Sequence, residues 1–382
     1  MNSEINLERL ADTFTTLCEI SSPSRHEKKV RDYLRHVFTE LGADEIVEDD
    51  SARQTGADCN NLIVRFAGSQ KGEPLFFACH MDTVQPGDNV EVVRTGDIFT
   101  SAGQTILGGD DKSGIAPLIE LVHMLKEQSL PHGDFELVFT TCEEIGLRGA
   151  KALNHQLLRA RYGYALDSTG IDKLIIGAPA ANRFTVTVHG IAAHAGMNPE
   201  EGISAFEMAA EAITNLTLGR IDEESTANLG VMQGGTATNI IPEQLVIHGE
   251  VRSHSEDKLA RYTANIESAF TASVADRRKD NGAGDAPPRV EFLVEPEYPA
   301  MRLRETDPVV QRAITAAHKL GRELHREIAG GGSDANIFNG YGLSTAILAT
   351  GMSKVHSTDE WVDLRDMRRL TEMLIALVCT SE

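Results

Sequence analysis

Four apolar segments of this chain have the length of buried β-strands, and each is followed by a side chain that could bind a metal. The segments cover residues 75–79, 135–142, 162–166 and 344–349. The side chains that follow them are His80, Glu143 with Glu144, Asp167 and His356. If the segments are neighbouring strands of one sheet, their carboxyl ends meet where open α/β sheets bind ligands. The sequence therefore predicts that these side chains share one crevice and form a metal site.

Helix-like and strand-like segments alternate through the first part of the chain. Two helices are expected within the first forty residues, and Ser24 with Glu27 has the spacing of a capping box at the start of the second. Expected helices at 115–127 and 147–158 then alternate with the apolar strands. This alternation predicts an α/β domain with a mostly parallel central sheet.

The middle of the chain has a different order of elements. Between residues 180 and 295 the pattern is strand, helix, strand, strand, helix, strand, which is the βαββαβ order of a ferredoxin-like module. His356 lies beyond this module, so the first domain must be discontinuous if the site is real. We therefore expect one catalytic domain of residues 1–179 and 296–382, and an inserted lid or dimerisation domain of residues 180–295.

Composition excludes several classes of partner. The 36 Lys and Arg residues face 57 Asp and Glu residues, and the net charge of -21 repels nucleic acid and anionic membranes. Residues 1–6 have no basic start followed by an apolar core, and no apolar run is long enough to span a bilayer, which favours a cytoplasmic protein. The five cysteines are scattered and never spaced as Cys-x-x-Cys, so neither a disulfide framework nor a thiolate zinc site is expected.

Two acidic motifs could supply the chemistry. Asp110 and Asp111 precede a lysine in a glycine-flanked loop, where two carboxylates would repel phosphate. One of them could bridge two cations, although an acidic helix N-terminus stabilised by the helix dipole is the alternative. Glu143 and Glu144 point to opposite faces of an extended chain, so one could bind metal while the other takes a proton from water. A solvated acidic pair remains the alternative there.

His80 and Asp82 form a third motif. Residues two apart at a strand end lie on the same side, so Asp82 is a candidate to orient the His80 ring. The complete set of candidate ligands contains only nitrogen and oxygen donors, which suits zinc, cobalt or manganese.

In their order along the chain, these motifs resemble the co-catalytic dizinc metallopeptidases and deacylases that include carboxypeptidase G, acetylornithine deacetylase and peptidase T. The resemblance covers essentially the whole chain and is strongest to peptidase T-like tripeptide aminopeptidases. It rests on His80-Met81-Asp82-Thr83, Asp110-Asp111-Lys112, Glu143-Glu144-x-Gly146, Asp167 and His356-Ser357-Thr358-Asp359-Glu360. Gly109 departs from peptidase T, which usually has alanine there, and we expect the smaller residue to leave the ligands in place.

The resemblance implies two zinc ions, with cobalt or manganese as substitutes, and a role for each residue. Asp110 would bridge both metals, His80 with Asp167 would complete one site, and Glu144 with His356 would complete the other. Glu143 would be the general base that activates a water between the metals, and Asp82 would orient His80. In the inserted domain, His194 would stabilise the oxyanion. The residues implied to contact the rest of the substrate are Asn239, Arg252, Gly331 and Gly332.

The expected activity is metal-dependent hydrolysis of peptide bonds that releases the N-terminal residue from tripeptides or other short peptides. An N-acyl-amino-acid deacylase or carboxypeptidase on the same scaffold is the first alternative, because it would use the same ligands. A non-catalytic peptide-binding protein is the second. The expected partners are a short peptide and a second copy of the chain, bound through the inserted domain.

Overall fold

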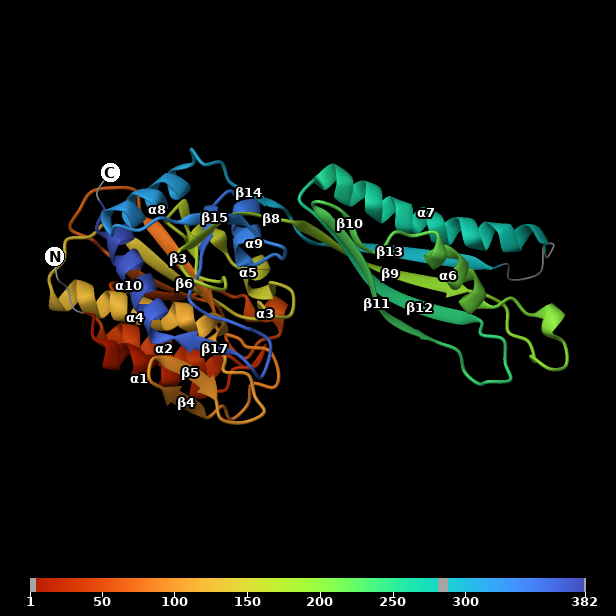
Figure 1. The fold of residues 1–382 in the computed structure, drawn as a ribbon, viewed down its shortest axis with the longest axis horizontal. Coiled ribbons are helices and arrows are strands. Elements are labelled where there is room, and N and C mark those ends of the chain that lie inside the picture. Colours follow the sequence, from red (N-terminus) through yellow and green to blue (C-terminus); the bar gives the residue numbers. More distant parts are fainter. Residues whose placement is uncertain (1–4, 281–287, 381–382) are drawn as a thin grey trace. The chain divides into compact units, whose positions relative to one another are not determined.

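The computed structural model describes residues 5–280 and 288–380 of the chain. The chain divides into two compact units, one of Met1–Gly177 with Met301–Glu382 (unit 1) and one of Ala178–Ala300 (unit 2). The expected borders at 180 and 295 fall just inside unit 2. The colours of Figure 1 let the reader follow the chain through both units.

Unit 1 is built on a mixed sheet whose middle strands are parallel. The strands run in the order β1 (Glu45–Glu48), β2 (Leu62–Phe66), β6 (Phe135–Thr140), β3 (Leu75–His80), β7 (Tyr162–Ala165), β16 (Ser344–Leu348), β8 (Lys173–Ala178) and β14 (Met301–Arg302), with β15 (His325–Ile328) also paired to β8. The pairs β6–β3, β3–β7 and β7–β16 are parallel, whereas β2 and β8 join this core antiparallel. Strands β3, β6 and β7 are buried along their whole length, which explains their continuous apolar sequences. The predicted α/β architecture is confirmed.

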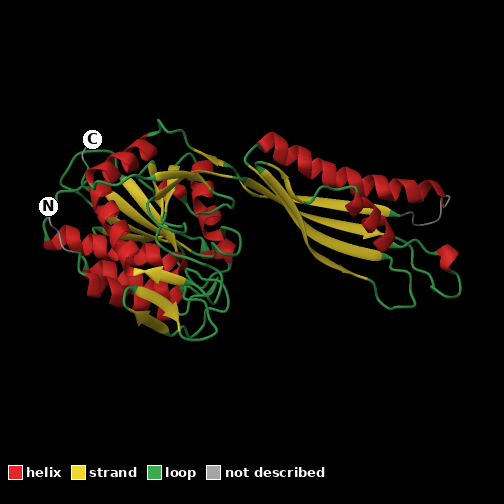
Figure 2. Ribbon diagram, in the orientation of Figure 1, coloured by secondary structure: helices red, strands yellow, loops and turns green. Residues whose placement is uncertain are grey.

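Helices pack against this sheet to close one hydrophobic core (Figure 2). The longer ones are α1 (Leu7–Glu19), α2 (Lys28–Glu40), α4 (Gly109–Glu127), α8 (Pro308–Lys319) and α10 (Leu364–Val378), and the short ones are α3 (Ala52–Thr55), α5 (Arg148–Ala152) and α9 (Asp334–Gly340). The sequence pattern did not reveal a small sheet of β17 (Trp361–Asp363), β5 (Ile98–Ser101) and β4 (Val92–Thr95).

Two local predictions were wrong. The helix expected over 147–158 is divided into α5 and the short 3-10 helix η1 (His155–Leu157), because Leu153 is extended and the Asn154 side chain accepts a hydrogen bond from Gln156 N. The capping box is not formed either, since Glu27 is the N-cap residue of α2 without a side-chain capping bond. Ser24 and Glu27 contact the candidate site instead.

Unit 2 is an antiparallel sheet with two helices. Its strand order is β10 (Gly219–Asp222), β11 (Ser225–Gly234), β12 (Gln244–Ser253), β9 (Ala180–His189) and β13 (Arg289–Tyr298). Helices α6 (Ala205–Thr214) and α7 (Glu256–Asp280) pack against it around a separate core that includes Phe184, Ile247 and Phe270. Without the short edge strand β10, this is the ferredoxin-like βαββαβ arrangement, so that prediction is confirmed with one added strand.

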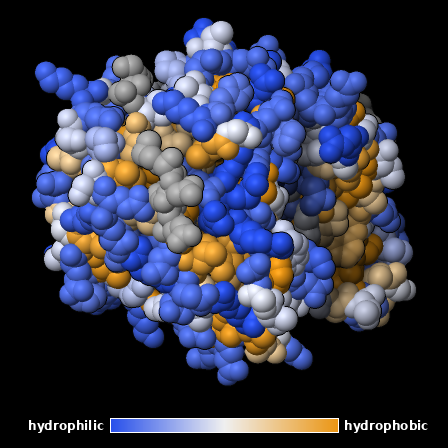
Figure 3. All heavy atoms as spheres, turned by 60° about the vertical axis from the view of Figure 1, so that its left-hand side comes forward, coloured by the Kyte–Doolittle hydropathy of each residue, from blue (hydrophilic) through white to orange (hydrophobic). Residues whose placement is uncertain are grey.

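The surface is largely polar. Figure 3 shows a face on which hydrophilic residues predominate and hydrophobic residues form separate patches. Among the helices of residues 5–280 and 288–380, none has the length and apolarity that crossing a bilayer requires.

Candidate metal centre and active site

The predicted ligands converge at the carboxyl ends of the parallel strands. His80 is the last residue of β3, Glu143 and Glu144 follow β6, and Asp167 follows β7. The ligand atoms of His80, Asp110 and Asp167 lie within 4.8 Å of one another, and so do those of Asp110, Glu144 and His356. Asp110 belongs to both groups, which is the arrangement that a ligand bridging two cations requires.

Each oxygen of Asp110 faces a different histidine. Oδ1 lies 3.0 Å from His80 Nε2, and Oδ2 lies 3.2 Å from His356 Nε2. His356 Nε2 is also 3.0 Å from Glu144 Oε1. Hydrogen bonds to Asp110 and Glu144 raise the pKa of His356 to about 10 in the absence of metal. The carboxylates therefore attract positive charge to this point, and a cation would replace the proton there.

Glu143 is buried and Asp167 is partly buried, and both lie close to other carboxylates. Burial, reinforced by Asp110, raises the pKa of Asp167 to about 7. Burial also raises the pKa of Glu143 well above its ordinary value, and His80 opposes this shift. Close-set buried carboxylates repel one another unless protons or cations compensate their charge. The donor set thus fits two divalent cations chemically as well as geometrically.

Asp82 holds the two glutamates through their backbone. Its carboxylate is fully buried and accepts hydrogen bonds from Glu143 N at 2.9 Å, Glu144 N at 3.2 Å and Ser24 Oγ at 2.6 Å. The His80 ring lies nearer to the Asp82 main-chain carbonyl, with Nδ1 at 2.9 Å, than to the carboxylate, at 3.6 Å. The predicted orienting residue is therefore in place, but its carbonyl oxygen makes the shorter contact with the ring.

Glu360 holds the backbone of Asp110, a contact that the sequence did not predict. This buried carboxylate accepts hydrogen bonds from Leu107 N and Gly108 N, both at 2.8 Å, and from Asp110 N at 3.1 Å. The contacts join residues some 250 positions apart. In the sequence, the one indication of this role was that Glu360 belongs to the motif that begins with His356. The Asp110–Asp111 peptide bond, near the start of α4, is cis.

His356 reaches the site on a loop rather than on a strand. The loop follows β16 and is fixed by backbone hydrogen bonds from Gly351 N to Gly170 O, at 2.6 Å, and between Ser353 and Trp361. His356 itself has a φ of 60°, in the left-handed region that few residues other than glycine adopt. This bend turns its ring toward Asp110 and Glu144.

Asp334 is a second buried acid that the predicted set lacked. It lines a small cavity together with His80, Asp111 and Asp167, and it accepts a hydrogen bond from Thr140 Oγ1. Burial raises the pKa of Asp334 to about 6. The sequence offered a signal only in the preceding glycine loop, where Gly331 and Gly332 were assigned to substrate binding.

The residues predicted to contact the substrate can be placed within their own units. Gly331 and Gly332 lie in unit 1, just before the Ser333 N-cap of α9. In unit 2, His194 is exposed and adjoins Asn239, because Ala195 N donates to Asn239 O.

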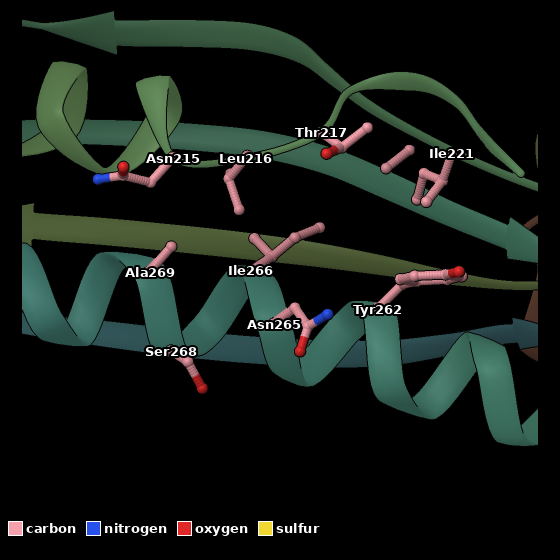
Figure 4. Close-up of a pocket in the computed structure, with 10 residues that line it drawn as sticks. Asn215, Leu216, Thr217, Ile221, Tyr262, Asn265, Ile266, Ser268 and Ala269 are labelled. Atoms are coloured by element: carbon pink, nitrogen blue, oxygen red, sulfur yellow. The ribbon is translucent and has the colours of Figure 1, made fainter.

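Arg252 of β12, also in unit 2, makes two hydrogen bonds of 3.0 Å to the Glu250 carboxylate. The roles of His194, Asn239, Arg252, Gly331 and Gly332 stay predictions. A separate pocket in unit 2 lies between α7, the segment after α6 and β10, and is shown in Figure 4. Its lining has neither an acidic residue nor a histidine or cysteine, so it has no metal-binding character.

Comparisons with known proteins identify the family. A model described as peptidase family M20/M25/M40 matches residues 76–380. The uncharacterized protein YqjE of Bacillus subtilis (strain 168) is 38% identical over 375 residues, which cover 98% of each chain. Aminopeptidase PepT of Bacillus cereus superposes with a TM-score of 0.89 at 38% identity, and a tripeptidase of Staphylococcus aureus with a TM-score of 0.92 at 34% identity, each over 98% of both chains. The family that the motifs resembled is thus confirmed, and the chain belongs to peptidase family M20/M25/M40.

Proposed function

We propose that the protein is a dizinc aminopeptidase that releases the N-terminal residue from tripeptides and other short peptides. The observation that carries this proposal is the pair of ligand groups that share Asp110, with Glu143 buried beside them. Membership of a peptidase family and similarity to structures described as an aminopeptidase and a tripeptidase support peptide substrates.

Each residue of the site would contribute a defined step. His80, Asp110, Glu144, Asp167 and His356 would hold two cations, which when bound polarise a carbonyl and lower the pKa of water. Glu143 would take a proton from the attacking water and deliver it to the leaving amine. Burial raises the pKa of Glu143, which makes its carboxylate a stronger base toward that water. His194 would stabilise the oxyanion.

Glu143→Gln tests the assignment of the base. The amide keeps the shape of the side chain but accepts no proton, so we expect turnover to be lost while two metal ions remain bound. Glu73→Gln, an exposed site in the same unit, is the matched control and should behave as the wild type. Full activity of Glu143→Gln would assign the base elsewhere.

A substrate panel separates the proposal from the deacylase and carboxypeptidase alternatives. Tripeptides with a free amine, the same tripeptides with an acetylated amine, and N-acyl-amino acids should be compared with zinc, cobalt and manganese. We expect cleavage only when the amine is free. Preference for the acylated compounds would support the deacylase, and binding of every peptide without cleavage would support the non-catalytic alternative.

A homodimer through unit 2 is part of the proposal. Large hydrophobic side chains that are exposed in unit 2 are Met197, Phe206, Leu218, Val231, Met232, Ile240 and Leu293. Surfaces of this kind commonly mark interfaces between proteins. Sedimentation of the wild type as a monomer at all concentrations would reject the dimer. The cytoplasmic location stays a prediction.

A further inference from the structure

A second cluster of potential metal ligands lies in unit 1, outside the proposed catalytic centre. One ligand atom each of Glu27, Asp58 and Cys59 lies within 4.8 Å of the others. Glu27 and Cys59 are buried, and Asp58 is exposed. The cluster joins the residue before α2 to the loop that follows α3, so three separate side chains converge on one point at the edge of the core.

Glu27 carries an oxygen whose bonding is incomplete. Its Oε1 accepts hydrogen bonds from Arg25 N at 2.8 Å, Cys142 N at 3.0 Å and Cys142 Sγ at 3.4 Å. Its Oε2 is buried and has no hydrogen-bond partner among residues 5–280 and 288–380, and the side chain is fully buried. A buried polar atom left unpaired costs free energy whether the carboxyl group is charged or neutral. A cation at the cluster would satisfy Oε2 without disturbing the three hydrogen bonds to Oε1.

The surroundings favour a divalent cation over a proton. Asp58 is held toward the cluster because its Oδ1 accepts a hydrogen bond from Lys28 N at 2.9 Å. Burial raises the pKa of the Cys59 thiol, with Glu27 adding to the shift, so the thiol stays protonated without an ion. Of the basic groups close by, the Arg31 guanidinium is already paired with Asp32 and Glu48, and His26 Nδ1 lies 3.8 Å from Asp58 Oδ2. Two carboxylates therefore attract a cation to the sulfur.

We propose that Glu27, Asp58 and Cys59 form a third cation site that takes a thiophilic divalent ion such as zinc. On binding, the ion displaces the proton of the Cys59 thiol, which is released to solvent. One sulfur and two carboxylate ligands suit zinc and leave a position for water. The site differs from the catalytic centre, whose proposed ligands are all nitrogen and oxygen. Through Glu27 Oε1 and Cys142 N, it adjoins the segment that carries Glu143.

The difference in ligand chemistry gives a direct test. Cadmium or cobalt is titrated into the metal-free protein, and the thiolate-to-metal charge-transfer band is followed in the ultraviolet. The catalytic ligands give no such band, so its appearance reports sulfur ligation alone and does not depend on activity. We expect one thiolate per chain to bind, together with a metal content of three ions at saturation. A wild-type protein without the band would overturn the proposal.

Matched variants assign the sulfur. We expect Cys59→Ser to abolish the band, while Cys379→Ser and Cys142→Ser retain it. Loss of the band in Cys142→Ser with retention in Cys59→Ser would refute the site as drawn. Asp58→Asn changes an exposed residue and keeps the test open if Cys59→Ser does not fold. Asp58→Asn should weaken the affinity for cadmium or cobalt by at least about tenfold, because replacing even a residue that only supports a metal ligand has an effect of that size. An unchanged affinity would also refute the proposal.

Discussion

Glu360→Gln should weaken metal binding although Glu360 is not itself a ligand. The carboxylate uses Oε2 for two backbone amides and Oε1 for Asp110 N, so both oxygens act as acceptors. Glutamine has the same shape but only one acceptor oxygen. If that oxygen faces Leu107 and Gly108, the amide NH2 faces Asp110 N and leaves a buried donor unpaired. This should lower the free energy of unfolding by about 1–3 kcal/mol.

The same change should displace the backbone of Asp110, the proposed bridging ligand. Replacing a residue that supports a metal ligand typically lowers metal affinity or activity by about 10–100-fold, and we expect a loss in this range. Competition between the metal-free protein and a chelator measures the affinity, and denaturant unfolding of the same protein measures the stability. Asp359→Asn is the control, because this neighbouring carboxylate is exposed. If Glu360→Gln binds metal as tightly as the wild type, the three hydrogen bonds do not position Asp110.

Changes at three other residues of the candidate site or next to it also have measurable expected outcomes. Gly109→Ala should cost about 1–3 kcal/mol of stability, because the new Cβ would lie 2.6 Å from Val362 Cγ2. Adding Val362→Ala should relieve this clash. If Gly109→Ala alone melts at the same temperature as the wild type, the predicted clash is absent. Asp82→Asn should lower kcat on the order of tenfold to a hundredfold by loosening Glu143, which steady-state kinetics with saturating metal can check. Asp167 should make the metal-free protein less stable as pH rises from about 4 to about 7, because folding raises the pKa of this carboxyl and the folded state then binds the extra proton; Asp167→Asn should remove this contribution. Denaturant unfolding at both pH values, with and without metal, should show this slope only in the metal-free protein.

The sequence predicted that the candidate ligands lie together, because most of them follow a strongly apolar strand. Strands β3, β6 and β7 are buried on both faces, so their continuous apolar sequences could be recognised, and their parallel order brings His80, Glu144 and Asp167 close together. The resemblance to a known family then implied roles that spacing alone left open. Those roles stay predictions.

The supporting contacts could not be predicted in the same way. Glu360 and Ser24 act on residues far away in the chain, and nothing in their own neighbourhoods indicates which amides or carboxylates they will meet. Ser24 and Glu27 even matched a helix-capping pattern, but tertiary contacts with Asp82 and Cys142 use their polar atoms instead. The helix predicted over 147–158 failed for a local reason. Leu153 is extended, and the Asn154 side chain caps η1 by accepting a hydrogen bond from Gln156 N.

The place of β16 in the sheet has a consequence for biosynthesis. β7 and β8 follow each other in the chain, yet β16 lies between them and is synthesised only after all of unit 2. Until residues 344–348 have been synthesised on the ribosome, β7 and β8 both lack the strand that pairs with them, and their edges stay unpaired. Unit 2 can complete its own sheet meanwhile. The same late segment that closes the sheet also leads to His356, so the central sheet and the candidate site both wait for residues beyond unit 2.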